Sequence, residues 1–297
     1  MQFEWEGVFP ALTTPFTADD RIDFSTFNFN LQAQLNAGAK GVILGGTLGE
    51  ASSLLNAEKY ELVRYTVEQV SGRVPVIMNI AEQTTKGAVA AAKEAQHCGA
   101  AGLMLLPPMR YNADAHETLT YFKAVADATP LPIMIYNNPV DYKILVTLEM
   151  FAEMSDWPTI QAVKESTRDI SNVTRMLNRF GNRFKILCGV DTLALESLLM
   201  GAHGWVAGLV DAFPQETVDI FNLAKSGHVE EARKLYQWFL PLLELDIHPK
   251  LVQYIKLAEV ATGLGTEYVR APRLPLEGEE RIRVWNIIQD AIRLKPK

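Results

Sequence analysis

Two reactive side chains stand at the ends of successive apolar runs. Lys164 closes the run 160–164, and Tyr136 closes the run 131–136. If both runs are neighbouring strands of one sheet, the two side chains lie on backbones only about 4.8 Å apart. Burial lowers the pKa of a lysine, and a neutral amine can attack a carbonyl or imine carbon while an adjacent phenol shuttles protons. The alternatives are a lysine that extends to solvent and an ordinary core tyrosine.

A glycine-rich loop follows another apolar run. Residues 45–50 contain Gly46, Thr47 and Leu48, and such a loop offers backbone N–H groups to a carboxylate or another small anion. It has neither the lysine of a P-loop nor the dinucleotide fingerprint. The loop is therefore a candidate carboxylate site, with an ordinary tight turn as the alternative.

The elements that must position these groups alternate along the chain. Near-continuous apolar runs, typical of strands buried on both faces, occupy residues 8–13, 41–44, 74–79, 102–106, 131–136, 160–164, 184–188 and 205–209. Helical spacing follows each run, over residues 26–37, 57–70, 86–97, 118–128, 148–154, 170–180, 193–200 and 215–225. This alternation predicts an α/β fold, a closed (β/α)8 TIM barrel with its active site at the carboxyl ends of the strands. An open doubly wound sheet is the alternative, but the first strand lacks the glycine fingerprint usual there.

The last part of the chain has helical spacing only, over residues 229–245, 251–262 and 277–290. We therefore expect the 297 residues to divide into two parts. Residues 1–226 form the catalytic barrel, and residues 227–297 form a C-terminal helical appendage.

The composition excludes several classes of protein. Hydrophobic residues make up 48% of the chain and charged residues 21%, which excludes a disordered chain. The net charge of −7 comes from mixed acidic and basic residues, so no basic stripe is available to nucleic acid. No run reaches the ~20 apolar residues of a membrane span, and the cytoplasm is the expected location. No metal site is expected, because metal-ligand spacing is missing among His97, His116, His203, His228 and His248.

Three ordered motifs resemble one known family. They are Gly46-Thr47-Leu48-Gly49-Glu50, Tyr136-Asn137-Asn138-Pro139 and Lys164-Glu165-Ser166, and through them the chain resembles the dihydrodipicolinate synthase and N-acetylneuraminate lyase family. The resemblance implies a (β/α)8 barrel, a homotetramer, no metal or organic cofactor, and a small carboxylate substrate. It also implies that Lys164 forms a Schiff base, that Tyr136 relays protons, and that the Thr47–Leu48 backbone binds the substrate carboxylate.

Departures from the family pattern narrow the range of substrates that we expect. Synthases of this family have two adjacent threonines in the loop, but the second position here is Leu48, which cannot pass a proton. They also have an arginine two residues after the motif proline, where this chain has Asp141. Their tyrosine after the fourth strand aligns with Arg110, or with Tyr111 if the alignment slips by one. Condensation of pyruvate with aspartate semialdehyde is therefore disfavoured, as is N-acetylneuraminate cleavage.

The 1-pyrroline-4-hydroxy-2-carboxylate deaminases of hydroxyproline breakdown are the subgroup that the chain resembles most. The likeness includes Val140 after the tyrosine motif, Cys188-Gly189-Val190-Asp191, and the segment 204–210. It implies a hydrolytic deamination to 2,5-dioxopentanoate and ammonia through Lys164 and Tyr136. The substrate-binding residues that it implies are Gly46, Thr47, Leu48, Arg110, Gly189 and Val206.

Other activities stay open at this point. One is a dihydrodipicolinate synthase-like enzyme or another pyruvate-dependent aldolase or lyase, and another is a sugar-acid dehydratase. A barrel that binds a 2-oxo acid as a sensor, without turnover, is the non-enzymatic alternative.

Overall fold

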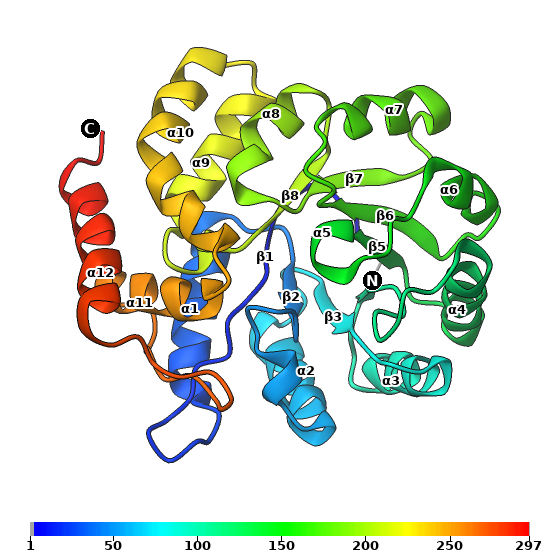
Figure 1. The fold of residues 1–297 in the computed structure, drawn as a ribbon, viewed down its shortest axis with the longest axis horizontal. Coiled ribbons are helices and arrows are strands. Elements are labelled where there is room, and N and C mark those ends of the chain that lie inside the picture. The colour runs from blue at the N-terminus through cyan, green and yellow to red at the C-terminus, as the bar shows by residue number, and fades with distance from the viewer. Residues whose placement is uncertain (1–2, 297) are drawn as a thin grey trace.

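The computed structural model describes residues 3–296, in which parallel strands form a barrel surrounded by helices (Figure 1). The strands are β1 (Gly7–Pro10), β2 (Val42–Leu44), β3 (Val76–Ile80), β4 (Gly102–Leu105), β5 (Ile133–Asn137), β6 (Ile160–Glu165), β7 (Lys185–Cys188) and β8 (Gly204–Ala207). They pair in the order β1-β8-β7-β6-β5-β4-β3-β2. A parallel bridge between Ala11 and Ile43, with a 3.0 Å hydrogen bond from Leu12 N to Ile43 O, joins the two end strands. The predicted (β/α)8 barrel is confirmed.

The helices that alternate with the strands match the predicted segments closely. They are α1 (Phe24–Ala37), α2 (Asn56–Val70), α3 (Thr85–His97), α4 (Ala115–Ala128), α5 (Pro139–Tyr142), α6 (Leu148–Met154), α7 (Ser171–Phe180), α8 (Ala194–Leu199) and α9 (Pro214–Lys225). The short helix α5 is not among the predicted segments. None of the helices in the described part of the chain has the length and apolar character needed to cross a membrane.

Two strands end two or three residues before the predicted runs do. β1 ends at Pro10 and β8 at Ala207, whereas the apolar runs continue to residues 13 and 209. Ala11 N and Leu12 N still donate to the backbone of β8 and β2, but the amides of Thr13 and Leu209 bond to side chains. Thr13 N donates to Asp211 Oδ2 at 3.2 Å and Leu209 N donates to Asp191 Oδ2 at 2.8 Å. These residues therefore belong to the loops that form the barrel mouth.

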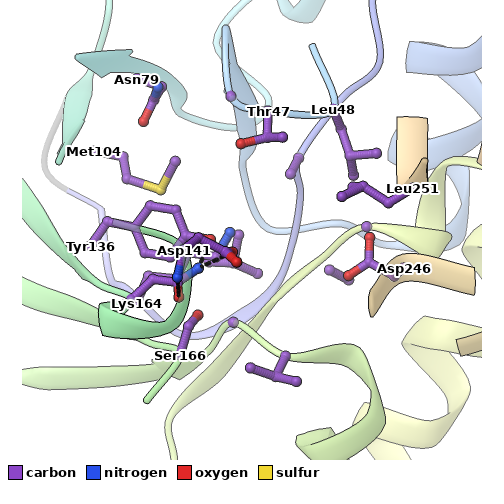
Figure 2. Close-up of a pocket in the computed structure, with 18 of the residues that line it drawn as sticks. Thr47, Leu48, Asn79, Met104, Tyr136, Asp141, Lys164, Ser166, Asp246 and Leu251 are labelled. Carbon is purple, nitrogen blue, oxygen red and sulfur yellow. Dashed lines mark hydrogen bonds between the residues drawn. The ribbon is translucent and has the colours of Figure 1, made fainter. Parts of the chain in front are cut away.

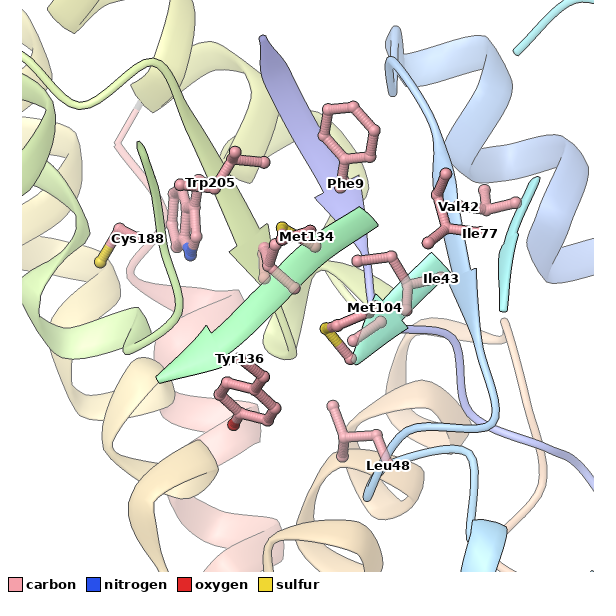
Figure 3. Packing of buried hydrophobic residues seen from close by; sticks show 14 of the residues in the cluster. Phe9, Val42, Ile43, Leu48, Ile77, Met104, Met134, Tyr136, Cys188 and Trp205 are labelled. Carbon is pink, nitrogen blue, oxygen red and sulfur yellow. The ribbon is translucent and has the colours of Figure 1, made fainter. Parts of the chain in front are cut away.

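The inside of the barrel is filled by apolar side chains. Figure 3 shows Phe9, Met104 and Met134 gathered between the strands, with Tyr136 and Leu48 at the end of the cluster away from Phe9. Parallel strands bury side chains on both faces, which explains their near-continuous hydrophobicity. The filled interior leaves the carboxyl ends of the strands as the place for a site.

The C-terminal helices lie against one side of the barrel in Figure 1. They are α10 (Val229–Leu243), α11 (Leu251–Thr262) and α12 (Gly278–Arg293), and the 3-10 turn η4 (Glu244–Ile247) joins the first two. Their apolar residues share one core cluster with those of the barrel. The division of the chain at residue 226 stays a proposal.

A buried ion pair attaches α11 to the barrel mouth. Lys256 is fully buried, and its Nζ lies 2.5 Å from Glu50 Oε1 at the end of the glycine-rich loop. The same amine donates to the carbonyl oxygens of Thr14 and Tyr268, each at 2.7 Å. Every proton of the ammonium thus has an acceptor, which a buried charge requires. The pair therefore fixes the position of the glycine-rich loop relative to the C-terminal segment.

Replacing Lys256 by Met is expected to lower the free energy of unfolding by about 3 kcal/mol, because Glu50 keeps a buried charge without its closest partner. Urea unfolding followed by circular dichroism measures this loss. The matched control is Lys250→Met, since the Lys250 Nζ to Glu280 Oε2 pair is also 2.5 Å long but is solvent-exposed. Such exposed pairs contribute about 0–1 kcal/mol. Equal losses of unfolding free energy in the two variants would show that the buried pair contributes no more to stability than the exposed one.

Candidate active site

A cavity of about 90 Å³ lies at the carboxyl ends of the strands (Figure 2). Its wall combines side chains from strand ends, from the glycine-rich loop and from the C-terminal segment. The polar side chains in this wall are Thr47, Asn79, Tyr136, Asn138, Asp141, Tyr142, Lys164, Ser166, Arg168 and Asp246. A cavity of this size suits a small substrate.

Lys164 and Tyr136 are direct neighbours in the sheet. They are paired residues in the β5–β6 register, and Lys164 Nζ lies 4.2 Å from the centroid of the Tyr136 ring. Burial lowers the pKa of Lys164, while the nearby Tyr142, Asp246 and Asp191 act in the opposite direction. In the described part of the chain the amine has no ion-pair partner within 4.0 Å. A buried amine without such a partner favours its neutral, nucleophilic form.

The Tyr136 hydroxyl is held by the motif that follows it. Asn138 Nδ2 donates to the Tyr136 hydroxyl at 3.2 Å and to Asp141 Oδ2 at 2.7 Å. The Asn138 side chain also caps α5 by accepting from Asp141 N at 3.2 Å, and Pro139 occupies the first turn. Burial raises the pKa of Tyr136 to about 12, with Asn138 acting against this rise. The phenol is therefore held in one orientation and neutral at physiological pH, as a proton carrier requires.

Gly189 gives Lys164 the room that it occupies. A Cβ atom at position 189 would lie 2.5 Å from Lys164 Cγ and 2.6 Å from Lys164 Cε, and it would also meet Ser166 Oγ. Gly189 N donates to Glu165 O at 2.9 Å, which keeps the backbone of β7 close to the end of β6. Only a residue without a side chain fits between the two strand ends.

Gly189→Ala is expected to displace Lys164 and to lower turnover by on the order of 10²-fold, the cost of a misplacement near 1 Å. The measurement is kcat together with the rate of borohydride trapping on Lys164. Gly87→Ala is the control, because position 87 lies in α3, away from the cavity. Wild-type kcat in Gly189→Ala would show that this space is not needed.

The glycine-rich loop borders the cavity through Gly46, Thr47 and Leu48. Asn79 Nδ2 donates to Gly45 O and Thr14 Oγ1 donates to Gly49 O, each at 2.8 Å, so both ends of the loop are fixed. Among residues 3–296, the amides of Thr47 and Leu48 donate to no backbone or side-chain acceptor. Two neighbouring N–H groups of this kind can bind a carboxylate.

Tyr142 is a cavity residue that sequence reasoning missed. Its hydroxyl lies 3.3 Å from Thr47 Oγ1, and its ring makes an edge contact with Tyr136, with 5.4 Å between centroids. Tyr142 ends α5, the unpredicted helix, and it does not close an apolar run. The tyrosine motif followed by a helix-capping Asn138 is the signal that could have located it.

Five of the predicted substrate-binding residues line the cavity, and one does not. The lining residues are Gly46, Thr47, Leu48, Gly189 and Val206. Arg110 is exposed in the turn after β4, as is Tyr111, and neither borders the cavity. A substrate-binding role for Arg110 stays a prediction.

Asp191 follows β7 and begins the 3-10 turn η2 (Asp191–Leu193). Its carboxylate accepts from Trp205 Nε1 at 2.8 Å, from Gly208 N at 3.2 Å and from Leu209 N at 2.8 Å. These bonds fasten the end of β8 beside the cavity, and they satisfy a buried carboxylate whose pKa is raised by burial. Trp205 is fully buried, as a barrel-packing role predicts.

The C-terminal segment also lines the cavity, which the sequence did not indicate. Asp246 and Ile247 come from η4, and Leu251 begins α11. Figure 2 shows Asp246 and Leu251 across the cavity from Tyr136 and Lys164. The helical appendage is therefore part of the wall around the candidate site.

Comparisons with known proteins agree with this architecture. The model of the dihydrodipicolinate synthetase family matches residues 4–291. A 4-hydroxy-tetrahydrodipicolinate synthase from Exiguobacterium sibiricum is 30% identical, with 92% of each chain covered. One from Methanopyrus kandleri is 35% identical over 82% of this chain and 81% of its own.

Solved structures are similar over nearly the whole chain. A dihydrodipicolinate synthase from Bacillus anthracis has a TM-score of 0.93 at 27% identity, with 100% of both chains covered. A prophage protein from E. coli K12, solved in complex with pyruvate, has a TM-score of 0.91 at 25% identity, covering 97% of this chain and 99% of its own. The chain therefore belongs to the dihydrodipicolinate synthetase family, whose members are aldolase-type lyases that form a Schiff base on a lysine.

Proposed function

We propose that this enzyme deaminates 1-pyrroline-4-hydroxy-2-carboxylate to 2,5-dioxopentanoate and ammonia, with Lys164 as the nucleophile and Tyr136 as the proton carrier. The observation that carries the proposal is the buried Lys164–Tyr136 pair, 4.2 Å from amine to ring centroid. It faces the same cavity as the free amides of Thr47 and Leu48. Nucleophile, proton carrier and carboxylate cradle thus surround one small space.

The proposed reaction begins at C2 of the cyclic imine. Neutral Lys164 adds to C2, the bond from C2 to the ring nitrogen breaks, and that nitrogen takes a proton to become an amine on C5. In this proposal Tyr136 moves this proton and the C3 proton, whose loss gives an enamine on Lys164. The enamine electron pair then expels the C4 hydroxyl as water. A proton shift to a C5 imine and hydrolysis at C5 and C2 release ammonia, the dioxo acid and free Lys164, with one water consumed overall.

The cavity wall supports a substrate with one carboxylate. Leu48 places an apolar side chain beside the amide cradle, and Asp141 stands where related synthases have an arginine. A carboxylate at that position repels a second substrate carboxylate. The ring acid needs only the one cradle at Thr47 and Leu48.

A synthase-like condensation is the second candidate. The relatives named 4-hydroxy-tetrahydrodipicolinate synthase favour it, and Arg168 at the exposed rim of the cavity is a cation that could receive another carboxylate. Three other functions also depend on a lysine that reacts with a 2-oxo acid. They are an aldolase that releases pyruvate, a sugar-acid dehydratase, and a sensor that binds without turnover.

Parallel assays separate these activities. The purified enzyme is incubated with the hydroxylated pyrroline carboxylate, with pyruvate plus aspartate semialdehyde, and with a panel of 2-oxo sugar acids. Equimolar ammonia and 2,5-dioxopentanoate from the first substrate alone is the expected result. Turnover only with pyruvate plus aspartate semialdehyde, release of pyruvate, dehydration of a sugar acid, or binding without turnover would each overturn the proposal.

The homotetramer, the cytoplasmic location and the small carboxylate substrate are parts of the same proposal. They are supported by the membership of the dihydrodipicolinate synthetase family. Light scattering of the purified chain measures the assembly directly.

A further inference from the structure

Asp246 presents a carboxylate without a partner to the candidate site. It lies in η4 and lines the cavity, and Figure 2 shows it opposite Tyr136 and Lys164. In the part of the chain that the structure describes, its carboxylate accepts no hydrogen bond and forms no ion pair within 4.0 Å. A polar group left open in a cavity is available to a ligand.

Two other carboxylates near this cavity are already bonded. Asp191 accepts from Trp205 Nε1 and from the amides of Gly208 and Leu209. Asp141 accepts from Asn138 Nδ2 at 2.7 Å. Of the two carboxylates that line the cavity among residues 3–296, Asp246 is thus the one to which no group of the chain donates.

The surroundings of Asp246 favour its protonated form. A Cβ atom at Gly208 would lie 2.8 Å from Asp246 Cγ and 2.9 Å from Leu48 Cδ1, so the carboxyl group sits against the end of β8 beside a leucine. Ile247 and Leu251 add apolar surface to the same wall. Burial and the neighbouring Asp191 and Asp141 raise the pKa of Asp246 well above its usual value, and Lys164 acts against this rise. A neutral carboxyl group can donate a proton.

The substrate can be oriented by the groups already assigned. In the proposed reaction Lys164 is bonded to C2, and the amides of Thr47 and Leu48 donate to the oxygens of the carboxylate attached to C2. The rest of the carbon chain, with the C4 hydroxyl, extends into the remaining space. Asp246 offers an open carboxyl group on the wall opposite Lys164.

We propose that Asp246 is the acid that protonates the C4 hydroxyl as it leaves. This inference rests on the proposed deaminase function. The nitrogen lone pair of the Lys164 enamine forms the C2–N double bond, the C2–C3 pair becomes the C3–C4 double bond, and the C4–O bond breaks. The Asp246 proton converts the departing hydroxide into water, and Asp246 is left as a carboxylate that is reprotonated from solvent before the next turnover.

Asp246→Asn is expected to lower ammonia release by about 10²-fold, within the usual range for loss of a general acid. Borohydride trapping of pyruvate on Lys164 is expected to persist, because trapping needs only Schiff-base formation, which precedes loss of the hydroxyl. Asp246→Glu keeps an acid and is expected to recover part of the lost rate, whereas Asp246→Ala is not. Glu244→Gln is the matched control, since Glu244 is an exposed carboxylate of the same turn.

The outcomes separate this inference from the proposed function. A wild-type enzyme that traps pyruvate but releases no ammonia overturns the deaminase function, and the role of Asp246 with it. An active wild-type enzyme with an equally active Asp246→Asn variant overturns the role of Asp246 alone. An Asp246→Asn variant with a wild-type melting temperature that no longer traps pyruvate also overturns it, because Asp246 would then act before the hydroxyl leaves.

Discussion

Lys164→Ala is expected to abolish measurable turnover, with a loss on the order of 10⁴-fold or more, as when other enzymes lose their covalent nucleophile. The physical reason is that no other amine among the lining residues is buried beside Tyr136. Ammonia release from the hydroxylated pyrroline carboxylate measures the rate. Mass spectrometry after borohydride reduction with pyruvate measures the adduct, which is expected on Lys164 in the wild type and absent from the variant.

The control for this experiment is Lys185→Ala. Lys185 begins β7, at the opposite end of the strand from the cavity, so its loss is expected to leave the adduct on Lys164. An adduct at another lysine in Lys164→Ala, or full turnover in that variant, would remove Lys164 from the mechanism. Because the adduct needs only a 2-oxo acid, this result does not depend on which substrate the enzyme uses.

Tyr136→Phe is expected to lower turnover by on the order of 10³-fold, because one phenol moves protons in several steps that each depend on general acid–base catalysis. The ring that lies beside Lys164 Nζ is kept in this variant, so the packing of the amine is preserved. Rates of ammonia release and of pyruvate trapping are measured together. Both are expected to fall, since imine formation itself requires proton transfer.

Tyr121→Phe is the matched control for the loss of a buried tyrosine hydroxyl. Tyr121 lies in α4 outside the cavity, and its hydroxyl donates to Glu82 O at 3.4 Å. Its variant is expected to keep wild-type turnover. Wild-type turnover in Tyr136→Phe would instead show that another group carries the protons, and Tyr142, whose ring contacts Tyr136, would be the next candidate.

The closeness of Lys164 and Tyr136 could be predicted from the sequence. Each closes an apolar run, and consecutive strands of a parallel barrel bring their carboxyl ends to one mouth. The structure places the two residues as partners in the β5–β6 register. Local patterning was sufficient here because strand order in a (β/α)8 barrel follows chain order.

Positions in loops were harder to predict. Gly46, Thr47 and Leu48 border the cavity, since they follow a strand end directly. Arg110 lies in a turn farther from the end of β4, and it is exposed outside the cavity. The direction of a side chain in such a turn depends on local backbone angles, for which hydrophobic periodicity carries no signal.

The sequence by itself thus determined the barrel, its mouth, and the lysine and tyrosine that meet there. Only the tertiary structure revealed that Asp246, from the C-terminal helical segment, faces them across the cavity. A single 3-10 turn is too short to have a hydrophobic periodicity, so its sequence does not predict which residues it contacts. Its place depends on long-range packing of the C-terminal helices on the barrel, including the buried Lys256–Glu50 ion pair. Contacts between segments so far apart in the chain arise from the packed fold, whereas strand ends follow from local hydrophobicity.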